Sequence, residues 1–318
     1  MDKIRTVLGD IYPEALGFTH CHEHIFIERG KNAVINPALL LDDYRKSLRE
    51  LNLLHEAGGS ALIDAQPVMA GRMAEWLVKA SQDSGVHIIA STGFHKTCFY
   101  YEDSYIFHRT EQEITELYIS EIAHGMLTSR QAGTQNSDAR AGIIKTAVDF
   151  GGIFADKIYE KLHSAAAAAQ METGVPVMCH IEAGADAEEV IRFYTDAGVP
   201  AQSLWLAHLD RADDDIGHHQ AAASCGAYLE YDTIARPKYH SDAHECKLIM
   251  DMIKAGYGSK LLLGLDSTRE RLTSYGGKVG LTYLHDVFVP YLKSNGVTED
   301  EILRLTRDNP REALLITK

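Results

Sequence analysis

Eight short apolar segments recur along the chain, and each is followed by a stretch with the period of a helix. They cover residues 16–25, 60–67, 86–94, 141–149, 175–183, 203–210, 227–234 and 260–268. Strands that alternate with helices indicate a parallel sheet. Eight such units in 318 residues favour a closed barrel over an open sheet. We therefore predict an α/β protein in which residues 1–318 form a single (β/α)8 TIM-barrel domain.

Composition excludes several classes of partner. The net charge of -14 argues against a general nucleic-acid-binding protein, because phosphate backbones favour basic surfaces. No window approaches the roughly 20 apolar residues of a membrane span, and the first residues do not resemble a signal peptide. The five cysteines form no C-x-x-C pair and are typical of buried thiols in a reducing compartment. We expect a cytoplasmic protein that binds neither nucleic acid nor membranes.

Potential metal ligands stand at the carboxyl ends of the apolar segments, which converge on one mouth in a barrel. They are His22, His24, Lys145, His180, His208 and Asp266. His22 and His24 are two residues apart, so both imidazoles point to the same face of a strand and can hold one ion with Asp266. His180 and His208 would bind a second ion. Neutral imidazole accepts zinc, manganese, cobalt or nickel, and we place zinc first.

Lys145 differs from the other five residues because an ammonium group repels metal ions. Burial lowers the pKa of a lysine and leaves a nucleophilic amine. Such an amine can take up carbon dioxide, and the resulting carboxylate would bridge both ions. We therefore predict two divalent metal ions bridged by carboxylated Lys145.

Other histidines are expected to have structural places. His218 and His219 follow an acidic run and are assigned to a solvated helix. His87 begins a strand and should lie at the opposite end of the barrel. His20 precedes His22 by two residues, so it is either a core residue or a support for the ligands.

This pattern resembles the phosphotriesterase family of the amidohydrolase superfamily over nearly the whole chain. The resemblance is carried by "LGDIYPEALGFTHCHEHI" (8–25), "AGIIKTAVD" (141–149), "MCHIEAG" (178–184), "LAHLD" (206–210), "GLD" (264–266) and "TRDNPREAL" (306–314). It implies a metal-dependent hydrolase in which Asp266 and Lys145 are catalytic, the six residues named above bind two metals, and the chain forms a homodimer. Some relatives have glutamate where this chain has Lys145.

Two loops near the expected mouth are cationic although the chain is acidic. The loop after the seventh strand carries Arg236, Lys238 and Tyr239, and the loop after the eighth carries Arg269, Arg271 and Tyr275. Barrels often hold a phosphate at these loops, and arginine and lysine suit it. The loops resemble those of the branch that hydrolyses phosphorylated sugar lactones. The residues predicted to bind substrate are Lys238, Arg269, Tyr275, Tyr239, Arg271 and Tyr100. The alternative is that the loop charges are solvated and paired with nearby acids.

The resemblance implies hydrolysis of a lactone, above all a phosphorylated furanose 1,4-lactone, by a hydroxide that bridges the two metals. Asp266 would carry the proton to the leaving oxygen. The alternative substrates are phosphotriesters and non-phosphorylated lactones such as an acyl-homoserine lactone, for which Phe94, Phe99 and Phe107 offer an apolar wall. A non-enzymatic metal-binding or small-molecule-binding protein is the alternative from another class. The complete set of six groups weighs against it.

Overall fold

Eight parallel strands form the centre of the molecule in the computed structural model, which describes residues 2–128 and 137–318. Each strand pairs with the next along the chain, from β3 to β10. The strands are β3 (Phe18–Glu23), β4 (Gly59–Asp64), β5 (His87–Gly93), β6 (Ile143–Val148), β7 (Val177–Ile181), β8 (Leu204–Ala207), β9 (Tyr228–Tyr231) and β10 (Leu261–Leu263). All eight predicted segments are strands, and the predicted barrel is confirmed.

The barrel closes where β10 meets β3. The backbone N–H of Asp266 donates to the carbonyl of His22 at 2.9 Å and joins the last strand segment to the first. Gly264 allows this approach, since a Cβ there would lie 2.9 Å from the His22 nitrogen and 3.0 Å from its Cβ. Closure therefore brings two predicted metal ligands together, one from each end of the sheet.

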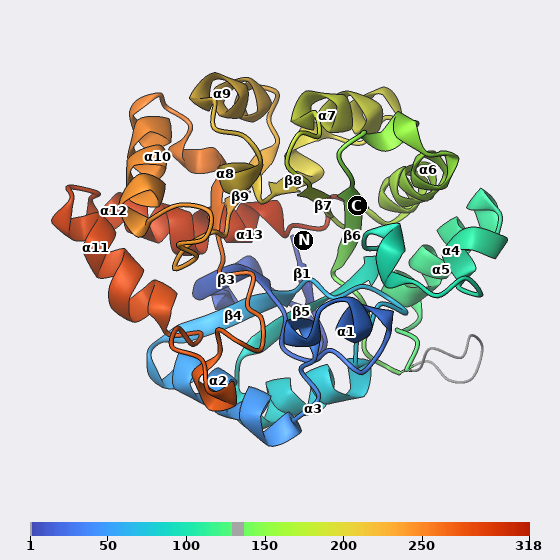
Figure 1. The fold of residues 1–318 in the computed structure, drawn as a ribbon, viewed down its shortest axis with the longest axis horizontal. Coiled ribbons are helices and arrows are strands. Elements are labelled where there is room, and N and C mark those ends of the chain that lie inside the picture. The colour runs from blue at the N-terminus through green and yellow to red at the C-terminus, as the bar shows by residue number, and fades with distance from the viewer. Residues whose placement is uncertain (1, 129–136) are drawn as a thin grey trace.

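Helices surround the sheet as an outer ring (Figure 1). They are α1 (Lys31–Ile35), α2 (Tyr44–Glu56), α3 (Ala74–Ser84), α4 (Tyr105–His108), α5 (Glu111–Ala123), α6 (Lys157–Thr173), α7 (Ala187–Asp196), α8 (Leu209–Ala212), α9 (Ile216–Ser224), α10 (Asp242–Lys254), α11 (Val289–Ser294), α12 (Glu299–Leu303) and α13 (Asn309–Ala313). π-Helical segments, Leu284–Phe288 and Arg304–Asp308, precede α11 and α13. The sequence explains where several helices begin. Thr110 and Glu113 form a capping box at the N-terminus of α5, and the side chain of Asp156 caps the N-terminus of α6.

Apolar side chains fill the barrel interior. Ile63, Ile89, Met178, Trp205 and Leu262, from five strands, belong to one buried cluster. Because strands in a parallel barrel are covered on both faces, they are apolar along most of their length. Apolar residues thus fill most strand positions, and the exceptions include His20 in β3 and Lys145 in β6, which are fully buried.

A short hairpin that the sequence analysis did not predict precedes the barrel. Its strands are β1 (Ile4–Thr6) and β2 (Gly9–Ile11), which pair antiparallel. Ile4 joins the interior cluster together with Ala313 and Leu314 from the end of the chain. Both ends of the chain therefore help to fill the barrel interior.

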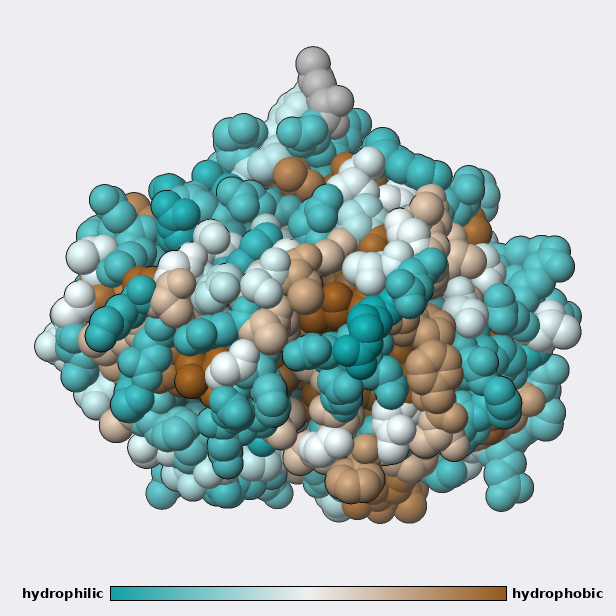
Figure 2. Space-filling view, turned by 90° about the horizontal axis from the view of Figure 1, so that it is seen from above, coloured by the Kyte–Doolittle hydropathy of each residue, from teal (hydrophilic) through white to brown (hydrophobic). Residues whose placement is uncertain are grey.

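Hydrophilic side chains cover most of the face shown in Figure 2, with smaller hydrophobic patches between them. Among the described residues, no helix is both long and apolar enough to cross a membrane.

Candidate active site

A pocket of 590 Å³ opens at the carboxyl ends of the strands. Five of the six predicted metal-binding residues line it: His22, His24, His180, His208 and Asp266. The sixth, Lys145, is fully buried and in contact with His22. The structure therefore brings all six predicted residues together, from strands that are far apart in sequence.

His22, His24 and Asp266 form the first candidate metal-binding group. One ligand atom from each lies within 4.8 Å of the others. The Nε2 atoms of His22 and His24 are 3.9 and 3.5 Å from the Asp266 Oδ1. The other ring nitrogen of His22, Nδ1, contacts the Glu230 carboxylate at 3.1 Å, which turns Nε2 toward Asp266.

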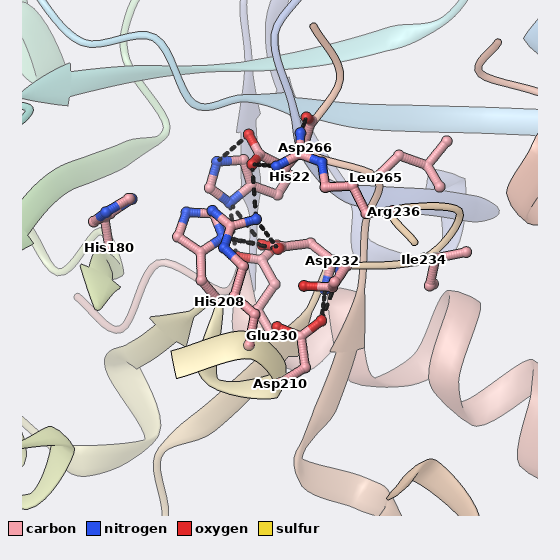
Figure 3. Close-up of polar contacts among 12 residues, drawn as sticks. His22, His180, His208, Asp210, Glu230, Asp232, Ile234, Arg236, Leu265 and Asp266 are labelled. Atoms are coloured by element: carbon pink, nitrogen blue, oxygen red, sulfur yellow. Dashed lines mark hydrogen bonds and ion pairs between the residues drawn. The ribbon is translucent and has the colours of Figure 1, made fainter. Parts of the chain in front are cut away.

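His180 and His208 form the second candidate group. Their ring centroids are 4.5 Å apart. The Nδ1 of His208 contacts a carboxylate oxygen of Asp232 at 2.7 Å, which leaves Nε2 as the available ligand atom. His180 lies to one side of the tighter cluster in Figure 3, and its Nε2 is 3.5 Å from a Glu182 oxygen.

Two candidate ligands occupy strained backbone conformations. His208 has φ 70° and Asp266 has φ 47°, in the left-handed region that non-glycine residues avoid. Such conformations cost on the order of 1–3 kcal/mol each and cluster at functional sites. The strain turns both side chains out of regular strand geometry at the pocket.

Lys145 lies on β6 among groups that do not neutralise an ammonium directly. Its Nζ is 3.4 Å from the His22 Nε2 and 3.3 Å from the Met178 sulfur. Burial lowers the pKa of Lys145, although Glu230 and Asp266 oppose that shift. The site therefore shifts Lys145 from the ammonium ion toward the neutral amine, compared with a lysine in water.

Burial favours the neutral form of His22, His180 and His208. It lowers the pKa of His22 and of His208 well below the usual value. It lowers the pKa of His180 to about 4, with Glu182 opposing the change. Neutral imidazoles are the form that binds metal ions. The Nδ1 of buried His24 also has no hydrogen-bond partner. The donor set therefore fits divalent cations.

Two guanidinium groups engage Asp266 on the side away from the histidines. Arg236 and Arg211 donate to its Oδ2 at 2.8 and 3.1 Å, and Arg236 also donates to its backbone carbonyl. Burial raises the pKa of Asp266, but Arg236, His24 and Arg211 outweigh burial, and the pKa falls well below its usual range. Asp266 is thus held ionised.

The residues predicted to bind substrate occupy three different places. Lys238, Tyr239 and Arg271 line the pocket. The Arg271 guanidinium is committed to the backbone, because it donates to the carbonyls of Leu265 and Ile234. The Lys238 ammonium lies 4.5 Å from the centre of the Tyr239 ring.

Arg269, Tyr275 and Tyr100 do not line this pocket. Arg269 and Tyr275 line a neighbouring hollow, where the guanidinium lies 5.3 Å from the tyrosine ring. The Tyr275 hydroxyl donates to the Asp43 carbonyl at 3.0 Å. Tyr100 is buried, and its hydroxyl accepts from the backbone N–H of His95 at 3.0 Å, which supports the pocket wall.

One expectation about the other histidines needs correction. His219 is fully buried rather than solvated, because its Nδ1 contacts the Tyr231 hydroxyl at 2.6 Å. His20 is fully buried and contacts Glu23 at 2.7 Å, which confirms the expectation of a core residue at this position. The register of β3 shifts between His20 and Glu23, so simple alternation fails there.

Sequence reasoning missed Arg211, Glu230 and Asp232. The two carboxylates are two residues apart on and just after β9, and this spacing in an apolar strand was the available signal. Burial raises the pKa of each well above its usual value, and a neighbouring carboxylate adds to the shift, Asp232 for Glu230 and Asp210 for Asp232. Arg211 lies one helical turn after His208, where no motif marked it.

Imidazole, carboxylate and amine groups at one barrel mouth can bind metal and activate water, so fold and site define the class of metal-dependent hydrolases. The chain belongs to the phosphotriesterase family, whose model matches residues 2–314.

Named relatives span more than one activity. A phospho-furanose lactonase of Mycoplasmopsis synoviae is 31% identical over 98% of this chain and 91% of its own length. A lactonase from Listeria monocytogenes has a solved structure with a TM-score of 0.90, 27% identity, and coverage of 99% of this chain and 100% of that one. An aryldialkylphosphatase of Saccharolobus solfataricus is 27% identical over 93% of this chain and 94% of its own length.

Proposed function

We propose that this protein hydrolyses a lactone, and that its substrate is a phosphorylated furanose 1,4-lactone. Water adds across the acyl C–O bond of the ring. The carbonyl carbon becomes a carboxylate, the ring oxygen becomes a hydroxyl, and one proton is released at neutral pH. The similarity to a phospho-furanose lactonase supports this substrate class.

The position of Lys238 carries the phosphate part of the proposal. Other cations at the pocket are paired: Arg211 and Arg236 with Asp266, and Lys96 with Glu182 at 2.6 Å. Among the residues that the structure describes, no carboxylate forms an ion pair with exposed Lys238. Its charge is therefore available to an anionic substrate. Arg269 and Tyr275 stay in the proposal because their hollow shares Ala38 and Glu270 with the pocket.

Two divalent cations would complete the site, and zinc is the metal that we propose first. His22, His24 and Asp266 would hold one, His180 and His208 would hold the other, and carboxylated Lys145 would lie between them. When bound, such ions lower the pKa of water and polarise a carbonyl oxygen.

Asp266 is the proton carrier in this proposal. Its Oδ2 is occupied by two guanidinium groups, whereas its Oδ1 faces the histidines. The ionised carboxylate accepts a proton from the attacking water and donates it to the ring oxygen as the acyl bond breaks.

Carboxylation of Lys145 requires a neutral amine. The nitrogen forms a bond to the carbon of carbon dioxide and loses one proton, which yields a carbamate. Burial of Lys145 supports this step because it favours the neutral amine.

Phosphotriester hydrolysis is the second candidate, together with hydrolysis of non-phosphorylated lactones. Leu39, Phe99 and Ile181 line the same pocket and suit apolar substituents. The similarity to an aryldialkylphosphatase points in the same direction.

A matched substrate panel tests the assignment. Metal-loaded enzyme is assayed with a pH indicator on pentono- and hexono-lactones, each with and without a terminal phosphate, beside an acyl-homoserine lactone and a phosphotriester. We expect a strong preference for the phosphorylated members. Equal rates across each pair, or preference for apolar substrates, would reject the phosphate assignment.

The variant Lys238→Ala tests whether Lys238 binds the phosphate of the substrate. Loss of a charged hydrogen bond is worth about 1.5–3 kcal/mol, so KM for the phosphorylated lactone should rise roughly 10- to 150-fold. The KM for its unphosphorylated partner should stay unchanged. Lys254→Ala, at an exposed position on α10, is the matched control and should alter neither value.

We also propose that the single-domain chain is cytoplasmic and forms a homodimer. The five cysteines are free, which supports a reducing compartment. The dimer is carried over from family resemblance alone, and light scattering on the purified protein tests it.

A further inference from the structure

Three potential ligands that the active site does not use meet behind the loop between β9 and α10. Asp210 belongs to α8, His240 ends the loop, and Glu245 lies in the first turn of α10. One ligand atom from each lies within 4.8 Å of the others. Asp210 is 1% exposed and Glu245 is 0% exposed.

Three of the four carboxylate oxygens of Asp210 and Glu245 lack hydrogen-bond donors. Neither side-chain oxygen of Glu245 has a hydrogen-bond partner, and neither does the Oδ1 of Asp210. The other Asp210 oxygen accepts from the backbone N–H groups of Asp232 and Thr233 at 2.9 and 2.6 Å, which fixes the carboxylate. Buried carboxylates without partners are costly unless a cation or a proton neutralises them.

The orientation of His240 points to a cation rather than a simple ion pair. Its Nδ1 is 3.3 Å from the Ser241 carbonyl, which favours the tautomer that has its proton on Nδ1. Its Nε2 is 3.1 Å from the Glu245 Oε2, yet this buried nitrogen makes no hydrogen bond. In this tautomer the His240 Nε2 and the Glu245 Oε2 are both electron-rich atoms, and they face each other at 3.1 Å.

We propose that Asp210, His240 and Glu245 bind a divalent transition-metal ion, a third site separate from the pocket. Ligands of a tetrahedral zinc ion with bonds of 2.0–2.1 Å stand ~3.3 Å apart, close to the observed nitrogen–oxygen separation. A set of one imidazole and two carboxylates suits zinc or manganese, and water would supply the remaining position.

The ion would fasten the loop that carries Arg236 and Lys238. Asp210 anchors the end of β8, whereas His240 and Glu245 anchor the junction of the loop with α10. Metal binding would thus hold the Arg236 and Lys238 side chains in place from behind the pocket. The proposal does not depend on which substrate is hydrolysed.

The alternative to a bound metal ion is a proton shared between Asp210 and Glu245. Burial raises the pKa of Glu245 well above its usual value, and the carboxylates of Asp210 and Asp232 raise it further. A protonated pair needs no metal, and Glu245→Gln would mimic its neutral form.

Counting the bound metal ions distinguishes the proposed metal site from a proton shared between Asp210 and Glu245. Full-length protein is loaded with zinc or with manganese, freed of loosely bound ions, and analysed by mass spectrometry for metal per chain. We expect wild type to hold one equivalent more than Glu245→Gln and His240→Gln. Asp251→Asn removes an exposed acid from the same helix and should keep the wild-type count. Equal counts in wild type and both variants overturn the proposal.

Anomalous diffraction from zinc-loaded crystals locates the ion directly, and it decides the matter if Glu245→Gln does not fold. A peak between Asp210, His240 and Glu245 is expected in wild type, and its absence with the active-site metals present overturns the proposal. Amide hydrogen exchange gives a further readout: residues 233–241 should exchange faster in His240→Gln than in wild type.

Discussion

At the scale of single residues, the candidate ligands are prepared by carboxylates behind them. Glu230 contacts the Nδ1 of His22, and Asp232 contacts the Nδ1 of His208. Each contact turns the Nε2 atom toward the pocket. An imidazole held in this way loses little freedom when it binds a metal. His22 with Glu230 and His208 with Asp232 thus form two pairs in which the imidazole is already oriented for a metal ion.

Lys145→Ala should lower turnover by at least about 10²-fold, since losses of this order follow removal of groups that support a metal. Metal content should fall with it, because the proposed bridge between the ions is gone. Added acetate should restore part of the activity by placing a carboxylate in the vacated space. Unchanged turnover and metal content would contradict the proposed role of Lys145.

His163 should make stability depend on pH. It is buried on α6 between the Tyr194 hydroxyl and the Ala147 carbonyl, and burial lowers its pKa to about 3. The unfolded chain binds a proton near pH 6.5, whereas the folded chain does not. Stability from this residue is therefore present above pH 6.5 and is lost as pH falls toward 3.

Denaturant unfolding at pH 7 and pH 5.5 measures this effect. Wild type should lose about 1 kcal/mol more than His163→Gln between these values, provided that both remain folded. His124→Gln, at an exposed position, should follow wild type. An identical loss in wild type and His163→Gln would show that another group is responsible.

At the scale of elements, β9 and the loop after it serve the pocket twice. The strand region supplies the carboxylates that orient His22 and His208, and the loop supplies Arg236 and Lys238. Changes at β9 should therefore affect metal affinity, whereas changes in the loop should affect substrate affinity.

The junction of β10 and β3 should not tolerate a side chain. Gly264→Ala would force the strands apart, because its Cβ would lie 2.9 Å from the His22 nitrogen. We expect a loss of about 1–3 kcal/mol in stability together with weaker metal binding, since overpacking displaces backbone.

Gly217→Ala is the matched control. Gly217 lies in α9, where an alanine Cβ would approach only the flexible Asp215 side chain, at 3.0 Å. Metal binding should be unchanged in this variant. Stability and metal affinity that match wild type in Gly264→Ala would show that the junction is looser than the structure indicates.

At the scale of the whole molecule, the candidate ligands join distant parts of the barrel. They come from β3, β6 and β7, from the end of β8, and from the turn after β10. Metal ions bound there would tie five of the eight strands together.

Removal of the metals should therefore destabilise the whole protein. Occupancy at 1,000 times Kd adds about 4 kcal/mol, so chelation should lower Tm by roughly 5–15 °C. Calorimetry with and without chelator measures the shift, and zinc should reverse it. A Tm that does not respond would mean that the ligands are preorganised without metal or do not bind it.

The order of apolar segments and helices was enough to predict the barrel. Parallel strands covered on both faces must be apolar, and this signal is local in the sequence. The candidate ligands were predictable because polar groups are rare in such strands. The single-domain boundary at residues 1–318 stays a prediction.

The partners of those groups were decided only by tertiary structure. Arg211 from α8 and Arg236 from the loop after β9 converge on Asp266, and Arg269 lies outside the pocket although Arg271, two residues later, lines it. A loop has no fixed period that relates sequence position to direction, so its charges cannot be placed from sequence. Strand order determined where the ligands gather, whereas barrel closure and loop packing decided which charges remain free for a substrate.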